Sequence, residues 1–313
     1  MPPRTEGYAV ASSDGSSIYW ESWAPAGAAR APTVVFSDGI GCDGYVWKYV
    51  RRALADRFRI VHWHYRGHGR SPPPRERSRV AIADLADDLA AVLDDAGVDA
   101  AILFGHSMGV QVSLETARRH PARVRALGLF CGAAEHPLRT FRGSAALERL
   151  LPRVRALVGR APRLVSRVSR AVVPTRLAYA LARQMEVNGL LLEERDFMPY
   201  LHGLSRVDPV LFLDMLAEAG KHSAVDLLPT LAVPLLVVAG SRDGFTPPEL
   251  SAAMAAAAPH ATLVMVDGGS HTAPLERPDY VNDAVLAFLS RNALDQAPTV
   301  RDAGLTVARK SHP

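Results

Sequence analysis

The chain has 313 residues, of which 48% are hydrophobic and 22% are charged, and its formal net charge is +4 at pH 7. This hydrophobic share excludes a disordered chain, and so small a net charge gives no reason to expect nucleic-acid binding. No segment approaches the ~18 consecutive apolar residues of a membrane helix, and no apolar stretch follows residues 1–7 as it would in a secretory signal. The two cysteines, Cys42 and Cys131, are too few for a four-cysteine zinc site, so we expect reduced thiols and a cytoplasmic protein.

Short apolar runs alternate with helical patterns in the first 135 residues, which is typical of a mostly parallel α/β sheet with crossover helices. The period-two pattern of residues 17–23 predicts a half-exposed strand. Continuous apolar runs predict strands buried on both faces at 33–37, 59–65, 101–104 and 124–130. Apolar positions with helical spacing predict helices at 46–56, 80–96 and 108–120.

This alternation stops between residues 136 and 226, where only Leu- and Arg-rich helical segments broken by prolines occur. It resumes with strands at 234–239 and 262–266 and helices at 247–257 and 278–289. We therefore expect a core made of residues 8–135 and 227–292, with 136–226 as a helical insertion packed over one sheet edge. The polar, aperiodic residues 293–313 are expected to form a flexible tail.

The strongest local motif is Gly105-His106-Ser107-Met108-Gly109, which lies between the predicted strand 101–104 and the helix that follows it. A serine in a sharp strand-to-helix turn has a strained backbone, and its neighbours two positions away must be very small. The turn exposes the hydroxyl above the sheet, and the helix N-terminus favours negative charge beside it. Ser107 is the predicted nucleophile, with Gly105 and Gly109 as its supports, and helix capping is its alternative role.

In this context the chain resembles the α/β-hydrolase fold family of esterases, lipases and C–C hydrolases, over about residues 12–291. Four further segments carry the resemblance, at the family's oxyanion loop, R-G-x-G-x-S turn, acid loop and histidine loop: 37–41, 66–71, 240–243 and 268–271. The resemblance implies an eight-stranded, mostly parallel sheet flanked by helices, with the helical insertion as a lid over the nucleophile.

A serine hydroxyl needs a base to become a good nucleophile, and the base needs an anion to orient it. His271 lies in a glycine-rich loop from which it can reach across the strand ends, and the chain order Ser, Asp, His fits the family. Asp243 follows the strand 234–239 and is the predicted acid, whereas Asp267 is expected to brace the histidine loop. His106 is expected to pack, because adjacent side chains at a sharp turn point apart.

The oxyanion formed in acyl transfer needs preset N–H donors, and the loss of one costs about 10²- to 10³-fold in rate. Geometry assigns one donor to the backbone of Met108, the residue after the nucleophile. The resemblance assigns the other to the backbone of Ile40, which follows Gly39. Both positions should tolerate changes of side chain.

Asp38 and His64 depart from the family pattern, which has His where Asp38 stands and Asp where His64 stands. An unpaired carboxylate beside an oxyanion hole would oppose the developing charge. We hypothesise that the two residues have exchanged roles and form a hydrogen bond; the alternatives are that Asp38 caps its own loop, pairs with Arg66 or faces water. His62, His64 and His68 are interpreted as structural.

The insertion is unusually basic. Thirteen Arg and one Lys against nine acidic residues give 136–226 a net charge of +5, and eleven Arg against Glu148 alone give 139–183 a net charge of +10. Leucines and valines recur among these arginines at helical spacing. Three readings stay open: a solvated arginine face, an anionic substrate such as a thioester or phospholipid, and transient docking at an acidic membrane surface.

Together these residues predict hydrolysis of a small-molecule carboxylic ester, a thioester or a lactone through an acyl-serine intermediate. No metal or organic cofactor is expected. The same three residues could cleave carbon–carbon bonds or perform perhydrolysis, and the chain could instead be a ligand-binding relative without turnover. The sequence does not indicate the oligomeric state.

Overall fold

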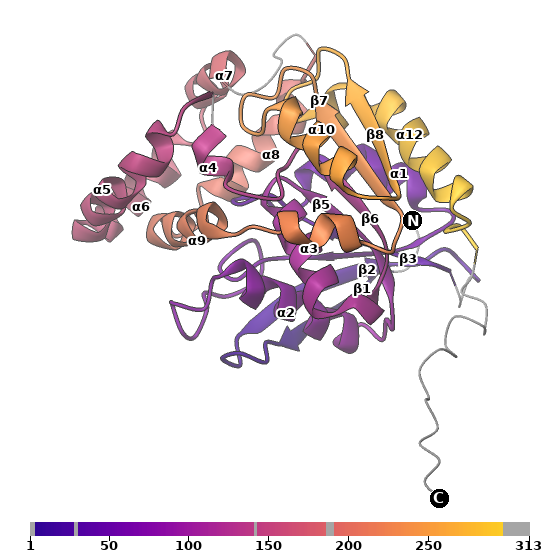
Figure 1. Ribbon diagram of the computed structural model, residues 1–313. Helices are drawn as coiled ribbons and strands as arrows, with labels where there is room; N and C mark the ends of the chain where they lie inside the picture. The colour runs from indigo at the N-terminus through magenta and orange to yellow at the C-terminus, as the bar shows by residue number, and fades with distance from the viewer. Residues whose placement is uncertain (1–3, 28–30, 141–142, 186–190, 297–313) are drawn as a thin grey trace, which may run out of the picture.

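The computed structural model describes residues 4–27, 31–140, 143–185 and 191–296, and a single eight-stranded sheet organises them (Figure 1). The strands follow the order β1-β2-β4-β3-β5-β6-β7-β8. Their bounds are Arg4–Val10 (β1), Ser17–Trp23 (β2), Thr33–Ser37 (β3), Arg59–Trp63 (β4), Ala101–His106 (β5), Val124–Phe130 (β6), Leu235–Gly240 (β7) and Ala261–Val266 (β8). This confirms the predicted α/β class and strand number.

The six neighbouring strands β4, β3, β5, β6, β7 and β8 are parallel, so their carboxyl ends lie along one edge of the sheet. β1 and β2 pair antiparallel to each other, and β2 pairs antiparallel to β4. The sequence did not predict β1, because its side chains are mostly exposed and carry no apolar alternation. β2 is more buried than expected, since it lies between β1 and β4 rather than at the edge.

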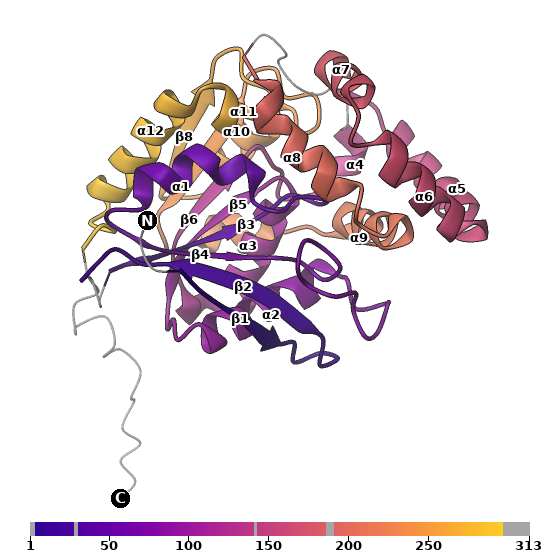
Figure 2. The ribbon, with the colours of Figure 1, turned by 180° about the vertical axis from the view of Figure 1, so that it is seen from behind.

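Helices cover both faces of the sheet (Figures 1 and 2). One face is covered by α1 (Lys48–Leu54) and α12 (Pro278–Arg291), and the other by α2 (Ile82–Asp95), α3 (Met108–Arg119) and α10 (Pro248–Ala257). Short helical turns complete the core: η1 (Tyr45–Trp47), η2 (Pro121–Arg123), η4 (Val225–Thr230) and α11 (Ala273–Glu276). The all-buried strands β3, β5 and β7 lie between these two layers, as expected for strands covered on both faces.

Among the described residues, six α-helices lie between β6 and β7 in the chain, where the sequence predicted a helical insertion (Figure 2). They are α4 (Pro137–Thr140), α5 (Ala146–Arg160), α6 (Pro162–Val172), α7 (Arg176–Met185), α8 (Glu194–Leu204) and α9 (Pro209–Lys221). The chain enters and leaves this insertion at adjacent points, since the Ala224 N–H donates to the Ala134 carbonyl at 2.9 Å. None of the described helices is both long and apolar enough to span a membrane.

The residues after α12 begin by packing against the core. Leu294 is buried in the hydrophobic cluster that also contains side chains of α1 and α12, and Asp295 forms an ion pair with Arg57. The rest of the predicted flexible tail, 297–313, lies outside the described residues.

Candidate active site

Ser107 occupies the tight turn between β5 and α3. Its backbone angles, φ 55° and ψ −117°, lie in a region that non-glycine residues rarely adopt. Both flanking glycines are sterically required: a Cβ on Gly105 would lie 2.1 Å from the Gly109 carbonyl oxygen, and one on Gly109 would lie 2.2 Å from the Ser37 carbonyl oxygen. Such strain is typical of positions where surrounding structure holds a functional side chain in place.

The sheet brings the three predicted reactive residues together at its carboxyl edge. The Ser107 hydroxyl is 2.9 Å from Nε2 of His271, although 164 residues separate them in the chain. Nδ1 of His271 lies 2.9 Å from Oδ2 and 3.2 Å from Oδ1 of Asp243. A carboxylate can only accept, so Nδ1 carries the proton and Nε2 is free to accept the serine proton.

Asp243 is held as a buried carboxylate by the loop after β7. It accepts hydrogen bonds from the backbone N–H groups of Phe245 and Thr246, at 2.8 and 2.9 Å, and from the Thr246 hydroxyl at 2.9 Å. Burial raises the pKa of Asp243. The charge of His271 and the hydrogen bonds from His271 and Thr246 lower it by more, so the pKa lies below its ordinary value. Asp243 therefore stays ionised at neutral pH.

Two residues outside the predicted set hold the loop of His271. Glu276 accepts hydrogen bonds from the Ser270 N–H at 2.7 Å and from the Thr272 hydroxyl at 2.8 Å. Nε2 of His106 donates to the His271 carbonyl at 2.8 Å, and burial, reinforced by His271, lowers the His106 pKa to about 4.

The sequence assigned the brace of this loop to Asp267, and that prediction is wrong, because Asp267 is exposed while the carboxylate of Glu276 is buried in the loop. The sequence carried one weak signal for Glu276, an acidic residue close behind the histidine, in a short helix before a proline. The direction of its side chain could not be read from that spacing.

The loop after β3 lies directly beside the serine turn. β3 and β5 are paired neighbours in which Ser37 lies opposite Gly105, so the loop beginning at Asp38 starts level with the turn. A Cβ on Gly39 would be 3.1 Å from the Ser107 Cβ. A cavity of about 60 Å³ opens here and is lined by Ile40, Ser107, Met108, Gln111, Ala133, Pro137, Leu138, Leu216, Ala219 and Thr246. Ile40 and Met108, the two predicted oxyanion donors, thus line the same cavity as the serine.

The hypothesis that Asp38 pairs with His64 is wrong, because Asp38 binds His62 instead. Its Oδ2 lies 2.8 Å from His62 Nε2, and its Oδ1 accepts from Trp47 Nε1 at 2.8 Å. His64 points elsewhere, with Nδ1 accepting the Arg70 N–H at 2.8 Å. The two histidines share one face of the chain at a spacing of two, so the sequence could not decide which of them meets the carboxylate.

His62 lies buried between two carboxylates. Its Nδ1 is 3.4 Å from Glu21 Oε1. Burial lowers the His62 pKa, but Asp38 and Glu21 together outweigh burial and raise it to about 9. The cation formed offsets the charge of Asp38 beside the oxyanion loop.

Glu21, His62 and His64 are also the one group among the described residues whose ligand atoms lie close enough to hold a metal ion, within 4.8 Å of one another. Both nitrogens of His62 already face carboxylates, and Nδ1 of His64 is engaged by the backbone. The cluster is therefore better suited to holding a protonated His62 between two carboxylates than to binding a metal ion. A cavity of about 300 Å³ adjoins it, lined largely by charged side chains from β2, α1 and α8, but Ser107 does not line it.

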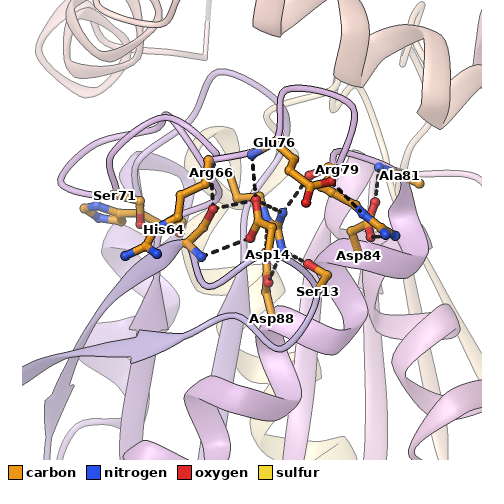
Figure 3. Close-up of polar contacts among 12 residues, drawn as sticks. Ser13, Asp14, His64, Arg66, Ser71, Glu76, Arg79, Ala81, Asp84 and Asp88 are labelled. Carbon is orange, nitrogen blue, oxygen red and sulfur yellow. Dashed lines mark hydrogen bonds and ion pairs between the residues drawn. The ribbon is translucent and has the colours of Figure 1, made fainter.

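The turn after β4 fixes the loop of Asp38 from the other side. His68 Nε2 accepts the Gly41 N–H at 3.0 Å, and the Tyr65 hydroxyl donates to the Asp38 carbonyl at 2.6 Å. Arg66, fully buried, anchors this turn through two hydrogen bonds to Asp88, at 2.6 and 2.7 Å (Figure 3). The R-G-x-G-x-S segment, which carries the family resemblance and in which His68 is interpreted as structural, thus positions the loop of Asp38.

Comparisons with known proteins identify the family of this chain. A model of the alpha/beta hydrolase fold family matches residues 32–278. The chain therefore belongs to that family, and the predictions of the family, of its fold and of a hydrolase enzyme are confirmed.

Three proteins illustrate the similarity. A protein of Azorhizobium caulinodans named "Putative carbamate hydrolase RutD" is 29% identical over 262 residues, which cover 82% of this chain and 90% of the relative. The crystal structure of a hydrolase from Pseudomonas aeruginosa matches with a TM-score of 0.73 and 25% identity, covering 91% of this chain and 98% of that one. An enol-lactonase from Burkholderia xenovorans has the same TM-score at 24% identity, covers 91% and 100% of the two chains, and shows the fold alone.

Proposed function

We propose that this protein hydrolyses a carboxylic ester through an acyl-serine intermediate. The observation that carries the proposal is the continuous hydrogen-bonded chain from the Ser107 hydroxyl through His271 to the buried carboxylate of Asp243. A neutral imidazole held in this tautomer is placed to act as a general base toward the serine.

The proposed reaction has two halves. His271 takes the proton of Ser107 as its oxygen attacks the substrate carbonyl, and then gives that proton to the leaving alcohol. A water molecule, deprotonated by His271, attacks the acyl-serine, and His271 then returns the proton to the serine oxygen as the acid is released. Asp243 stabilises the imidazolium in both halves, and the N–H groups of Ile40 and Met108 stabilise the oxyanion.

The residues around Ser107 support an uncharged acyl group. Apart from Gln111 and Thr246, the side chains that line the cavity with Ser107 are apolar, and no arginine is among them. An anionic acyl group would find no cation there, so we expect the acyl part of the substrate to be uncharged. Leu138 and Leu216 of the insertion line this cavity, which supports a role of residues 136–226 as a lid.

The experiment that tests the function is labelling with a fluorophosphonate probe together with turnover of p-nitrophenyl acetate. We expect the wild type to be labelled and active, and Ser107→Ala to be unlabelled and inactive with a nearly unchanged melting temperature. Ser290→Ala, a change at an exposed serine of α12, is the control and should behave as the wild type. Absence of labelling in the wild type would favour a ligand-binding protein without turnover.

Carbamate is a second candidate substrate class, favoured by the name of the relative from A. caulinodans. The same attack on a carbonyl carbon would release the alcohol and leave a carbamoyl-serine, or release the amine and leave a carbonate ester of the serine. Parallel assays on esters, thioesters, lactones and aryl carbamates separate these classes, and assays for carbon–carbon cleavage and perhydrolysis test the remaining alternatives. The two cysteines are buried and free, which supports the proposal of a reducing, cytoplasmic environment.

A further inference from the structure

The outer helices of the insertion, α5, α6 and α7, expose large aliphatic side chains to solvent. Thirteen large hydrophobic residues in the described chain are exposed, and eight of them lie on these three helices. They are Leu150, Val154 and Leu157 on α5, Leu164, Val168 and Val172 on α6, and Leu177 and Leu181 on α7, each between 43% and 69% exposed. Their spacing of three or four residues places them in one stripe along each helix.

The three helices lie together at the end of the molecule farthest from the sheet (Figures 1 and 2). The side chains of the stripes are exposed to solvent, and a monomer rarely exposes so many large apolar side chains on consecutive helices without a partner.

Arginines run beside these stripes. An exposed arginine directly precedes five of the eight apolar residues: Arg149, Arg153, Arg163, Arg167 and Arg176. A preceding residue lies about 100° around the helix, so guanidinium groups flank the stripes of α5 and α6, and Arg176 lies beside the start of the stripe of α7.

Most of these charges are unpaired. Arg176 pairs with Glu194 and Arg155 pairs with Asp214, but six exposed arginines form no ion pair with any other described residue. They are Arg149, Arg153, Arg160, Arg163, Arg167 and Arg170. The surface is therefore both apolar and strongly cationic.

We propose that the outer face of α5, α6 and α7 docks on an anionic lipid bilayer. An apolar stripe flanked by unpaired arginines on a helix too short to span a membrane is typical of helices that lie in the bilayer interface. The aliphatic side chains enter the boundary between headgroups and acyl chains, and the arginines extend to the lipid phosphates. The exposed large apolar residues of these helices include no aromatic ring that would anchor a defined protein partner.

The test is flotation of the full chain with vesicles of phosphatidylcholine alone or mixed with phosphatidylglycerol, at low and high salt. We expect binding to the anionic vesicles at low salt, a reduction of several-fold at high salt, and weak binding to the neutral vesicles. Arg163→Gln with Arg167→Gln should weaken binding by about 25-fold, at about fivefold for each of the two arginines. The control, Arg277→Gln with Arg291→Gln, removes the same charge from exposed positions at the two ends of α12 and should bind as the wild type.

A second pair of variants tests the apolar stripe. Leu164→Ser with Val168→Ser should abolish flotation, while Val10→Ser with Leu263→Ser, at exposed positions of β1 and β8, should preserve it. Circular dichroism and thermal unfolding establish that each variant is folded. Equal losses in test and control variants, or no binding by the wild type, would overturn the proposal. A dimer that Leu164→Ser with Val168→Ser dissociates, without vesicle binding, would overturn it in favour of contact between two copies.

Discussion

Asp38 places a carboxylate immediately before the loop that we propose binds the oxyanion, and the cation of His62 compensates the negative charge of that carboxylate. A lone carboxylate there would oppose the charge that develops on the substrate oxygen. His62 lies between Asp38 and Glu21 with its pKa raised to about 9, because the two carboxylates outweigh the effect of burial. Trp47 satisfies the other carboxylate oxygen of Asp38. The charge is thus balanced and its position fixed by buried groups.

The His62 cation predicts a specific dependence of stability on pH. The folded-state pKa of about 9 exceeds the ordinary value of 6.5, so the stabilisation is complete below pH 6.5 and is lost as the pH rises through 9. This loss is on the order of 3 kcal/mol. Urea unfolding between pH 6 and 9.5 should show a free energy of unfolding that falls more steeply for the wild type than for His62→Gln. The exposed His260→Gln variant should follow the wild type, and parallel curves for wild type and His62→Gln would contradict the charge assigned to His62.

At the scale of elements, the site depends on the close packing of the loop that begins at Asp38, after β3, against the turn of Ser107 between β5 and α3. The sequence predicted most strands to within two residues, because buried parallel strands are nearly continuous apolar runs. It also predicted Ser107, Asp243 and His271 as neighbours, since the motifs mark strand ends that a parallel sheet must align. It could not predict Glu276 or His62, whose partners are chosen by side-chain direction, nor β1, which is held by pairing with β2 rather than by burial.

Gly109 shows how closely the turn of Ser107 and the loop of Asp38 approach each other. A Cβ at this position would lie 2.2 Å from the Ser37 carbonyl oxygen and 2.8 Å from that of Asp38, and both obstacles are backbone atoms. Gly109→Ala must therefore move the loop of Asp38 away from the serine turn. We expect a loss of about 1–3 kcal/mol in the free energy of unfolding and a large fall in esterase kcat, measured by urea unfolding and p-nitrophenyl acetate turnover.

The matched control is Gly159→Ala in α5, where a Cβ would meet nothing within 4 Å. Alanine is favoured over glycine inside a helix by up to about 1 kcal/mol, so this variant should be as stable as the wild type or slightly more stable, with unchanged kcat. A Gly109→Ala enzyme that kept both its stability and its kcat would show that the loop of Asp38 does not need its present position.

At the scale of the whole molecule, the cavity at Ser107 exists only where the sheet and the insertion meet. Ile40, Met108 and Gln111 come from the core, while Leu138 and Leu216 come from α4 and α9. Its volume of about 60 Å³ holds only a few water molecules, at 10–15 Å³ for each. We therefore expect a short acyl group, whose length is limited by side chains of the insertion together with those of the core.

Truncating one of those side chains should therefore change the preferred acyl length. We expect the wild type to hydrolyse p-nitrophenyl acetate and propionate with a much higher kcat/KM than the octanoate. Leu216→Ala truncates a side chain that lines the cavity and should shift the preference toward butyrate and hexanoate. Each further methylene of the acyl chain that the enlarged cavity buries contributes about 0.8 kcal/mol to binding. Leu213→Ala, the same truncation one turn earlier on α9 but outside the cavity lining, should keep the wild-type profile. The same shift in both variants would mean that looser packing of the insertion, rather than the volume beside Ser107, controls acyl length.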